Sequence, residues 1–192
     1  MAFAWHNYAL AILLLAMIPF EGTCGSSHHH NRHRPNPYKS LHFSLFQHET
    51  INKTGYVIVN GVELEGGEEI TETTTPLGTL FVFQDPLTVT ANRSSKEVGT
   101  AEGSSITSSL DGFSSISVAK ITLRVKGRKG SVSIVGGTNN IKRSDHPVVG
   151  GTEDFLFVQG YVTSYPVDLK GPTVVYKIQF HLYWPPYPPQ AS

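Results

Sequence analysis

Short segments in which apolar and polar residues alternate run through most of this chain, and they constrain its fold more than any other feature. Residues 41–45, 116–125 and 174–184 show the alternation most clearly. Because side chains of a β-strand point alternately to its two faces, a period of two indicates strands with one buried face. Turns rich in Gly and Pro separate these segments, and nothing after residue 25 has the spacing of a long amphipathic helix. The sequence therefore predicts an all-β sandwich or barrel.

The segment VVGGTEDFLFVQGY, residues 148–161, predicts a bent hairpin within this sheet. We expect its first strand to end in a turn at Gly150 and Gly151, because glycine adopts backbone angles that other residues avoid. A second strand is expected to follow, with Phe155 and Phe157 among its apolar positions and Gly160 interrupting it. An ordinary turn between two core strands explains the same residues.

Other turn residues define further expected boundaries. Residues 80–83 predict a short strand that stops at Asp85-Pro86, and residues 87–89 resume it beyond the proline, which suits an edge or a bend rather than a central strand. The GRKG sequence at 127–130 predicts the basic tip of a hairpin. Residues 97–109 are mostly small, which would leave room inside a barrel or allow a tight approach of two backbones.

Composition excludes some classes of function. The 192 residues suggest one domain with extensions, and the 15 basic and 15 acidic residues cancel. A balanced chain without a basic stripe is not expected to bind nucleic acid. The sequence also lacks a nucleophile elbow, a P-loop and paired zinc-ligand motifs.

The N-terminal segment predicts secretion. Residues 9–18, ALAILLLAMI, form an apolar run of the length found in signal peptides, whereas spanning a bilayer needs roughly 20 apolar residues. We therefore predict a signal peptide over residues 1–25, with no membrane attachment after cleavage. The absence of Lys and Arg from residues 1–8 leaves a membrane anchor as the alternative. Cys24, the single cysteine, lies at the predicted cleavage site, so no disulfide is expected.

Polar extensions are expected on both sides of the domain. Residues 26–40 contain His28, His29, His30 and His33 among Ser, Asn and Pro, which predicts a disordered linker; a transition-metal site in it is the alternative. Residues 185–192 form a Pro-rich tail that cannot continue a sheet.

Two N-x-S/T sequons accompany the predicted signal peptide. They begin at Asn52 and Asn92, and both lie in polar segments between apolar runs. We predict N-glycosylation at these two positions, and chance occurrence of the tripeptides is the alternative.

Four motifs occur in a fixed order along the chain. They are LHFSL at 41–45, LGTLFVFQDPLT at 77–88, SKEVGTAEG at 95–103 and VVGGTEDFLFVQGY at 148–161. Together they resemble the motifs of the plant dirigent protein family. The resemblance implies an eight-stranded antiparallel β-barrel over residues 41–184, of the calycin-like or allene-oxide-cyclase-like type, in a homo-oligomer that is a trimer or a dimer.

The same resemblance implies a function without a cofactor, a metal or an oxidising centre. A separate laccase or peroxidase would make phenoxy radicals from monolignols such as coniferyl alcohol. The barrel would orient these phenolic molecules in the apoplast, so that coupling gives optically active lignans. One alternative is a cyclase or dehydratase of the same fold, similar to pterocarpan synthases, and another is a non-catalytic cell-wall binding module.

Several polar positions of the family pattern differ in this chain. A carboxylate, an amide or an arginine of the pattern is replaced at five positions, namely Gln47, Gln84, Thr138, Ser144 and Gln159. The resemblance therefore leaves the acid-base groups to be sought among neighbouring residues.

Four residues are the candidate catalytic groups: Glu49, Asp85, Arg143 and Asp145. Glu49 has the best claim to replace a missing carboxylate, because burial beside aromatic residues would raise its pKa and suit it to proton transfer. Asp85 precedes a proline, so a turn-forming role is the alternative. For Arg143 and Asp145, the alternative is a solvated ion pair in a loop.

Overall fold

The computed structural model describes residues 39–62, 74–169 and 173–186. The predicted signal peptide lies outside the described residues, as do nearly all of the predicted linker and of the Pro-rich tail. Within the described residues, no helix has the length and apolar character needed to cross a bilayer.

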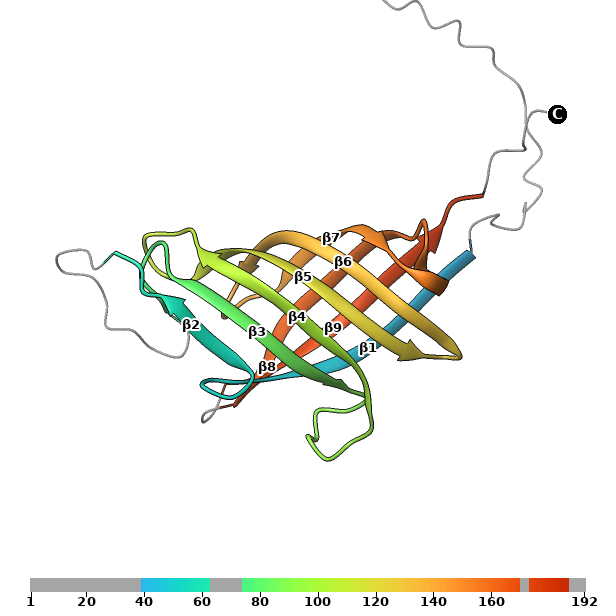
Figure 1. The fold of residues 1–192 in the computed structure, drawn as a ribbon, viewed down its shortest axis with the longest axis horizontal. Helices are drawn as coiled ribbons and strands as arrows, with labels where there is room; N and C mark the ends of the chain where they lie inside the picture. Colours follow the sequence, from blue (N-terminus) through green and yellow to red (C-terminus); the bar gives the residue numbers. More distant parts are fainter. Residues whose placement is uncertain (1–38, 63–73, 170–172, 187–192) are drawn as a thin grey trace, which may run out of the picture. The chain divides into compact units, whose positions relative to one another are not determined.

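Nine antiparallel strands form one sheet that closes on itself (Figure 1). In chain order they are β1 Lys39–Thr50, β2 Gly55–Val59, β3 Leu80–Thr88, β4 Glu97–Thr107, β5 Ser114–Val125, β6 Arg128–Asn139, β7 Ser144–Gly151, β8 Gln159–Asp168 and β9 Thr173–Trp184. Their order in the sheet is β1-β9-β8-β7-β6-β5-β4-β3-β2, and a second pairing of β1 with β3 closes an eight-stranded ring. The expected all-β barrel is therefore confirmed, with β2 as an additional strand.

The barrel closes where β3 pairs with β1 and β2 in succession. Phe46 and Gln47 pair with the end of β3, and β2 pairs with its beginning. Pro86 lies between these two pairings, where its missing N–H is not needed. The expectation that the strand would stop at Asp85-Pro86 is wrong, because β3 runs through the proline as one strand.

The interior is apolar over one half of the barrel. Inward-facing residues of the ring strands other than β7 form a continuous buried core there, and partly buried Val148 of β7 packs against it. The core includes Leu45, Leu87, Ile121, Leu123, Val132, Ile134, Val162, Ile178, Phe180 and Leu182. Phe43 and Phe180 stack across β1 and β9, with ring centroids 4.5 Å apart. This packing stabilises the barrel, because each of these side chains leaves water on folding.

The chain between β7 and β8 differs from the expected hairpin. Gly150 and Gly151 belong to β7, and the 3₁₀ helix η2 (Glu153–Phe155) follows in place of a strand. The left-handed backbone conformation falls on Glu153 (φ 51°) and Phe157 (φ 60°), not on the two glycines. A Cβ at Gly151 would lie 2.3 Å from the carbonyl oxygen of Phe155, so this glycine allows a close backbone approach rather than a reversal.

Two smaller expectations are also settled by the backbone. The β5–β6 turn consists of Lys126 and Gly127, so the predicted GRKG turn is one residue too late and its last residues belong to β6. In β4, a Cβ at Gly99 or Gly103 would meet a carbonyl oxygen of β5 within 2.3 Å. Tight approach of two strands therefore explains the glycines of this segment.

Candidate functional site

The second half of the barrel interior is polar and partly open. Where β1 ends and β9 begins, inward-facing positions carry small or polar residues and a few aromatic rings, among them Gln47, Glu49, Phe81, Phe83, Ser105, Ser117, Thr138, Ser164 and Tyr176. All of these residues are partly exposed, whereas most inward residues of the other half are buried. Solvent therefore reaches the interior from this end.

Four residues, Gln47, Glu49, Asp85 and Tyr176, form what we call the carboxyl cluster. Gln47 and Tyr176 lie directly opposite each other on β1 and β9, and Glu49 follows two residues later on the same face of β1. The Gln47 side-chain amide donates a hydrogen bond of 2.7 Å to Oδ2 of Asp85 on β3. The structure thus brings together two of the four candidate catalytic residues, Glu49 and Asp85.

Burial changes the acidity of the carboxyl cluster. It raises the pKa of Glu49 to about 8, and the nearby charge of Asp85 adds to this effect. Burial likewise raises the pKa of Asp85 to about 6, while side-chain hydrogen bonds with Thr54 and Gln47 oppose the rise. Oδ1 of Asp85 is buried without a hydrogen-bond partner among the described residues, which also favours the protonated form. Burial and the two carboxyl groups raise the pKa of Tyr176, so its hydroxyl stays protonated.

The pair of carboxyl groups can therefore hold and transfer a proton near neutral pH. Between about pH 6 and pH 8, Glu49 is protonated and Asp85 is ionised. A proton donor and a proton acceptor side by side in a partly open interior suit acid-base chemistry on a bound guest.

The facing wall of the polar half carries a second set of hydrogen-bonding groups. His146 on β7 is buried, and its Nε2 lies 3.0 Å from Oγ of Ser164 on β8. Thr138 donates a 2.8 Å hydrogen bond to Ser117. Burial lowers the pKa of His146, which keeps the imidazole neutral. His146 was not among the predicted site residues, although alternation along β7 places it on the same face as Ser144.

Arg143 and Asp145 lie away from the carboxyl cluster. They form an ion pair of 3.1 Å on the outer face, with side chains 59% and 55% exposed. Asp145 also accepts a 2.6 Å hydrogen bond from Thr163, and this bond lowers the pKa of Asp145. The structure does not bring this pair to Glu49 and Asp85, and a chemical role for it stays a prediction.

Comparison with known proteins places this architecture in a family. The family model for dirigent-like proteins matches residues 40–183. The chain belongs to the dirigent family. It is 29% identical over 127 residues to Dirigent protein 1 of Arabidopsis thaliana, covering 65% of this chain and 68% of that protein. It is 36% identical over 87 residues to a dirigent protein of Sinopodophyllum hexandrum, covering 45% of each chain.

Solved structures of similar fold include two pterocarpan synthase dirigent proteins. GePTS1 matches with a TM-score of 0.65 and 21% identity, covering 77% of this chain and 91% of that chain. PsPTS1 matches with a TM-score of 0.61 and 24% identity, covering 76% and 94%. At these identities the likeness concerns the fold of the dirigent barrel.

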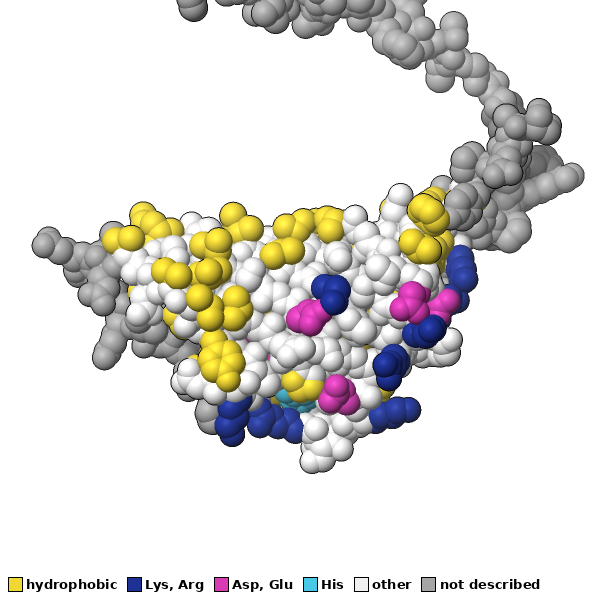
Figure 2. Space-filling view, viewed as in Figure 1, with side chains coloured by type: hydrophobic (Ala, Val, Ile, Leu, Met, Phe, Trp, Pro, Cys, Tyr) yellow, Lys and Arg dark blue, Asp and Glu magenta, His cyan; other side chains and the backbone are white. Residues whose placement is uncertain are grey.

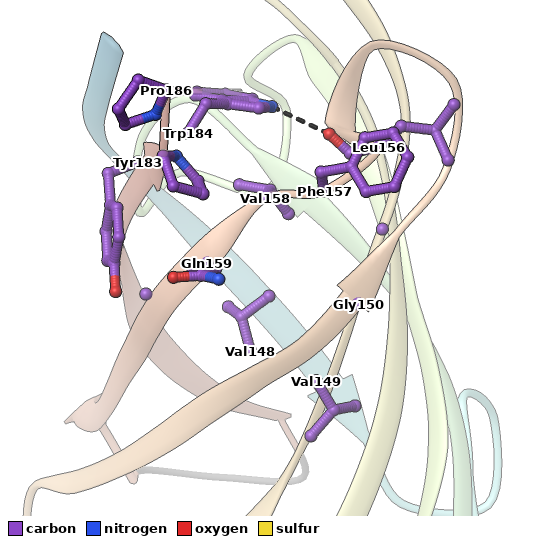
Figure 3. Close-up of a pocket in the computed structure, with 13 residues that line it drawn as sticks. Val148, Val149, Gly150, Leu156, Phe157, Val158, Gln159, Tyr183, Trp184 and Pro186 are labelled. Atoms are coloured by element: carbon purple, nitrogen blue, oxygen red, sulfur yellow. Dashed lines mark hydrogen bonds between the residues drawn. The ribbon is translucent and has the colours of Figure 1, made fainter. Parts of the chain in front are cut away.

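A surface groove of about 840 Å³ lies at the opposite end of the dirigent barrel (Figure 3). Leu156 and Phe157 line one side of it, and Tyr183 and Trp184 line the other. The Trp184 indole donates a 3.1 Å hydrogen bond to the carbonyl oxygen of Leu156, which ties the two sides together. None of the described residues that line the groove carries a carboxyl or imidazole group.

The five departures from the family pattern fall in different environments of the dirigent barrel. Gln47 and Thr138 face the polar half, and buried Ser144 accepts a hydrogen bond of 2.7 Å from the backbone of Asn139. Gln84 and Gln159 are exposed. The sequence differences therefore change the interior at the first three positions.

Both predicted glycosylation sites are sterically accessible. Asn52 lies in the turn between β1 and β2, and Asn92 lies in the loop between β3 and β4; both are exposed. The Asn92 side-chain oxygen accepts a 2.9 Å hydrogen bond from the backbone of Ser94. Glycosylation at these positions stays a prediction.

Proposed function

We propose that this dirigent-family protein is a stereochemical guide for the coupling of phenoxy radicals derived from monolignols such as coniferyl alcohol. A separate laccase or peroxidase supplies the radicals, and the product is an optically active lignan. The observation that carries the proposal is the partly open polar half of the barrel. There, aromatic rings and small residues adjoin groups that donate and accept hydrogen bonds.

Orientation of two guests is enough to select one product. A free-energy difference of about 1.4 kcal/mol between two competing arrangements gives a tenfold product ratio. The carboxyl cluster and the His146–Ser164 pair lie on different strands of the interior wall, so each can hold one polar end of a guest. The phenol and methoxy groups of a monolignol are polar ends of this kind.

The setting of the reaction is part of the proposal. The predicted signal peptide and the two exposed sequons support secretion to the apoplast. Exposed hydrophobic side chains gather on one side of the outer face, where Ile106 and Ile116 are paired neighbours that are 50% and 61% exposed (Figure 2). A patch of this kind supports a homo-oligomer, a trimer or a dimer.

The test is a coupling reaction with and without the protein. Coniferyl alcohol is oxidised by a one-electron oxidant, and the enantiomers of the dilignol products are separated by chiral chromatography. We expect an excess of one enantiomer only when the protein is present. Racemic product in both reactions would exclude this substrate.

A second candidate function is favoured by the raised pKa values of Glu49 and Asp85. An enzyme of the same fold would use this pair as acid and base on a phenolic substrate, in a cyclisation or a dehydration. It would turn over with no oxidant present, and its rate would pass through a maximum between about pH 6 and pH 8.

Substitution of the two carboxyl groups separates this candidate from the first. Glu49→Gln and Asp85→Asn are each expected to lower oxidant-free turnover about 100-fold or more. Glu102→Gln, which removes a carboxyl group from the outer face of β4, is the matched control and should keep full activity. Unchanged turnover in both interior variants would show that the assigned roles are wrong. Binding of phenolic molecules with no selectivity and no turnover would favour the cell-wall binding module.

A further inference from the structure

Two histidines face each other on the outer wall of the barrel, far along the chain from one another. His42 on β1 and His181 on β9 are directly opposite in the register of the two strands. Their Nδ1 atoms are 3.3 Å apart, and their ring planes are inclined at 64°. Both side chains retain exposure to solvent. This pair takes no part in the function proposed above.

The separation of the two nitrogens suits a shared metal ion. Imidazole nitrogens bind Zn²⁺ at about 2.0–2.1 Å, so two of them on a tetrahedral ion stand roughly 3.3–3.4 Å apart. The ion lies in the plane of each ring, and the angle between the planes is free to vary. The observed Nδ1···Nδ1 distance of 3.3 Å therefore agrees with the separation that a shared Zn²⁺ requires.

We propose that His42 and His181 form a two-histidine site for a divalent transition metal. Imidazole ligands suit Cu²⁺, Zn²⁺ and Ni²⁺, and Cu²⁺ is expected to bind most tightly of the three. No group of three or more His, Cys, Asp or Glu side chains that would suit a metal occurs among the described residues. Two protein ligands thus leave coordination positions for water or for an exogenous ligand.

The surroundings hold the pair in place. The Tyr161 ring on β8 stacks on His181, with centroids 4.6 Å apart and planes at 14°. Stacking restricts rotation of the imidazole, as hydrogen bonds to metal ligands do in other sites. The adjacent rung of the same ladder, Ser44 opposite Gln179, carries no charge.

One positive charge opposes the metal. The Lys126 ammonium group donates a hydrogen bond of 3.1 Å to the backbone carbonyl oxygen of His42. Repulsion between this cation and a bound divalent ion weakens binding without preventing it, because both groups are solvated. Lys126→Met is therefore expected to tighten metal binding by a few-fold.

The experiment must exclude the four histidines of residues 28–33. The parent protein is the full chain in which His28, His29, His30 and His33 are replaced by Ser, because four histidines close in sequence bind metal themselves. Cu²⁺ and Zn²⁺ are titrated into this parent by calorimetry in the presence of a weak competitor. We expect one ion per chain, and an electron paramagnetic resonance spectrum of the Cu²⁺ form with coupling to two nitrogen ligands.

Substitutions in the parent then identify the ligands. His42→Gln and His181→Gln are each expected to weaken binding at least about tenfold. The pair Ser44→Ala and Gln179→Ala on the adjacent rung is the matched control and should leave binding unchanged. Circular dichroism of the metal-free variants checks folding, and the spectrum of the parent counts nitrogen ligands without any change to the pair.

Two results would overturn the proposal. The first is a parent that binds no ion, in which case the two imidazoles share only an N–H···N hydrogen bond. The second is binding that survives both histidine substitutions, which would place the ion elsewhere. Neither result bears on the coupling or turnover assays of the interior.

Discussion

The two halves of the barrel interior are lined by the same strands and yet differ in almost every respect. On β9, Phe180 and Leu182 are completely buried among apolar neighbours, whereas Tyr176 near the start of the strand is partly exposed beside two carboxyl groups. On β5, Leu123 is buried and Ser117 is partly exposed. Each of these strands thus contributes buried apolar side chains at one end and polar, partly exposed side chains at the other. A continuous closed sheet permits this division, because the backbone hydrogen bonds of both halves are identical in kind.

Removal of packing from the apolar half should have the largest effect. Phe180→Ala is expected to lower the free energy of unfolding by about 3–5 kcal/mol, because the ring is completely buried and stacked on Phe43. Thr138→Val in the polar half should change it by less than about 1 kcal/mol. Chemical denaturation of both variants measures the contrast. Equal losses would mean that the two halves do not differ in packing.

Loss of the hydrogen bond to Asp85 should be the next largest effect. Gln47→Leu removes the hydrogen bond to Oδ2 of Asp85, whose buried Oδ1 already lacks a partner, at a cost of about 1.5–3 kcal/mol when Asp85 is ionised. The same change should raise the pKa of Asp85 further, because the bond from Gln47 lowers it. Carbon-detected NMR titration of Asp85 measures the shift. Gln84→Leu, on the exposed face of β3, is the control and should leave that pKa in place.

The carboxyl cluster should make stability depend on pH in a definite direction. The pKa of Glu49 is about 8 in the folded protein and near 4.3 in the unfolded chain, so the folded state binds the proton more strongly. The stabilisation is complete below about pH 4 and is lost as the pH rises toward 8. Glu49→Gln should flatten this decline by about 1–3 kcal/mol, since water in the open interior screens part of the effect. Unfolding free energies at pH 5, 7 and 9 test this; a variant that loses as much stability as the wild type between pH 5 and 9 would contradict it.

The smallest effect is expected on the outer face. Glu102 forms an exposed ion pair with Lys120, so Glu102→Gln should change stability by less than about 0.5 kcal/mol. Thermal unfolding at low and high salt measures this. A larger loss would show that charge on the outer wall matters as much as charge in the interior.

Much of the site follows from alternation along single strands. Leu41, Phe43 and Leu45 define the inward face of β1, and continued alternation places Gln47 and Glu49 on that face. The same reasoning from Phe81 and Phe83 places Asp85 inward on β3, and the observed positions agree.

The errors occur where the local pattern is ambiguous. Residues 144–151 lack a strong apolar alternation, so the outward position of Asp145 and the inward position of His146 were not distinguished. Between β7 and β8, the apolar residues of a 3₁₀ helix resemble those of a short strand. Only the close approach of Phe155 to Gly151 decides between them.

The strands and most of their inward faces follow from the amino-acid sequence alone, because the two-residue period of an extended backbone is a local property. The residues of distant strands that come into contact do not follow from it. Gln47 meets Asp85 across 38 residues of chain, and His42 meets His181 across 139. These contacts depend on the register of distant strands and on the closure of the sheet, and both are set by the packing of the whole barrel.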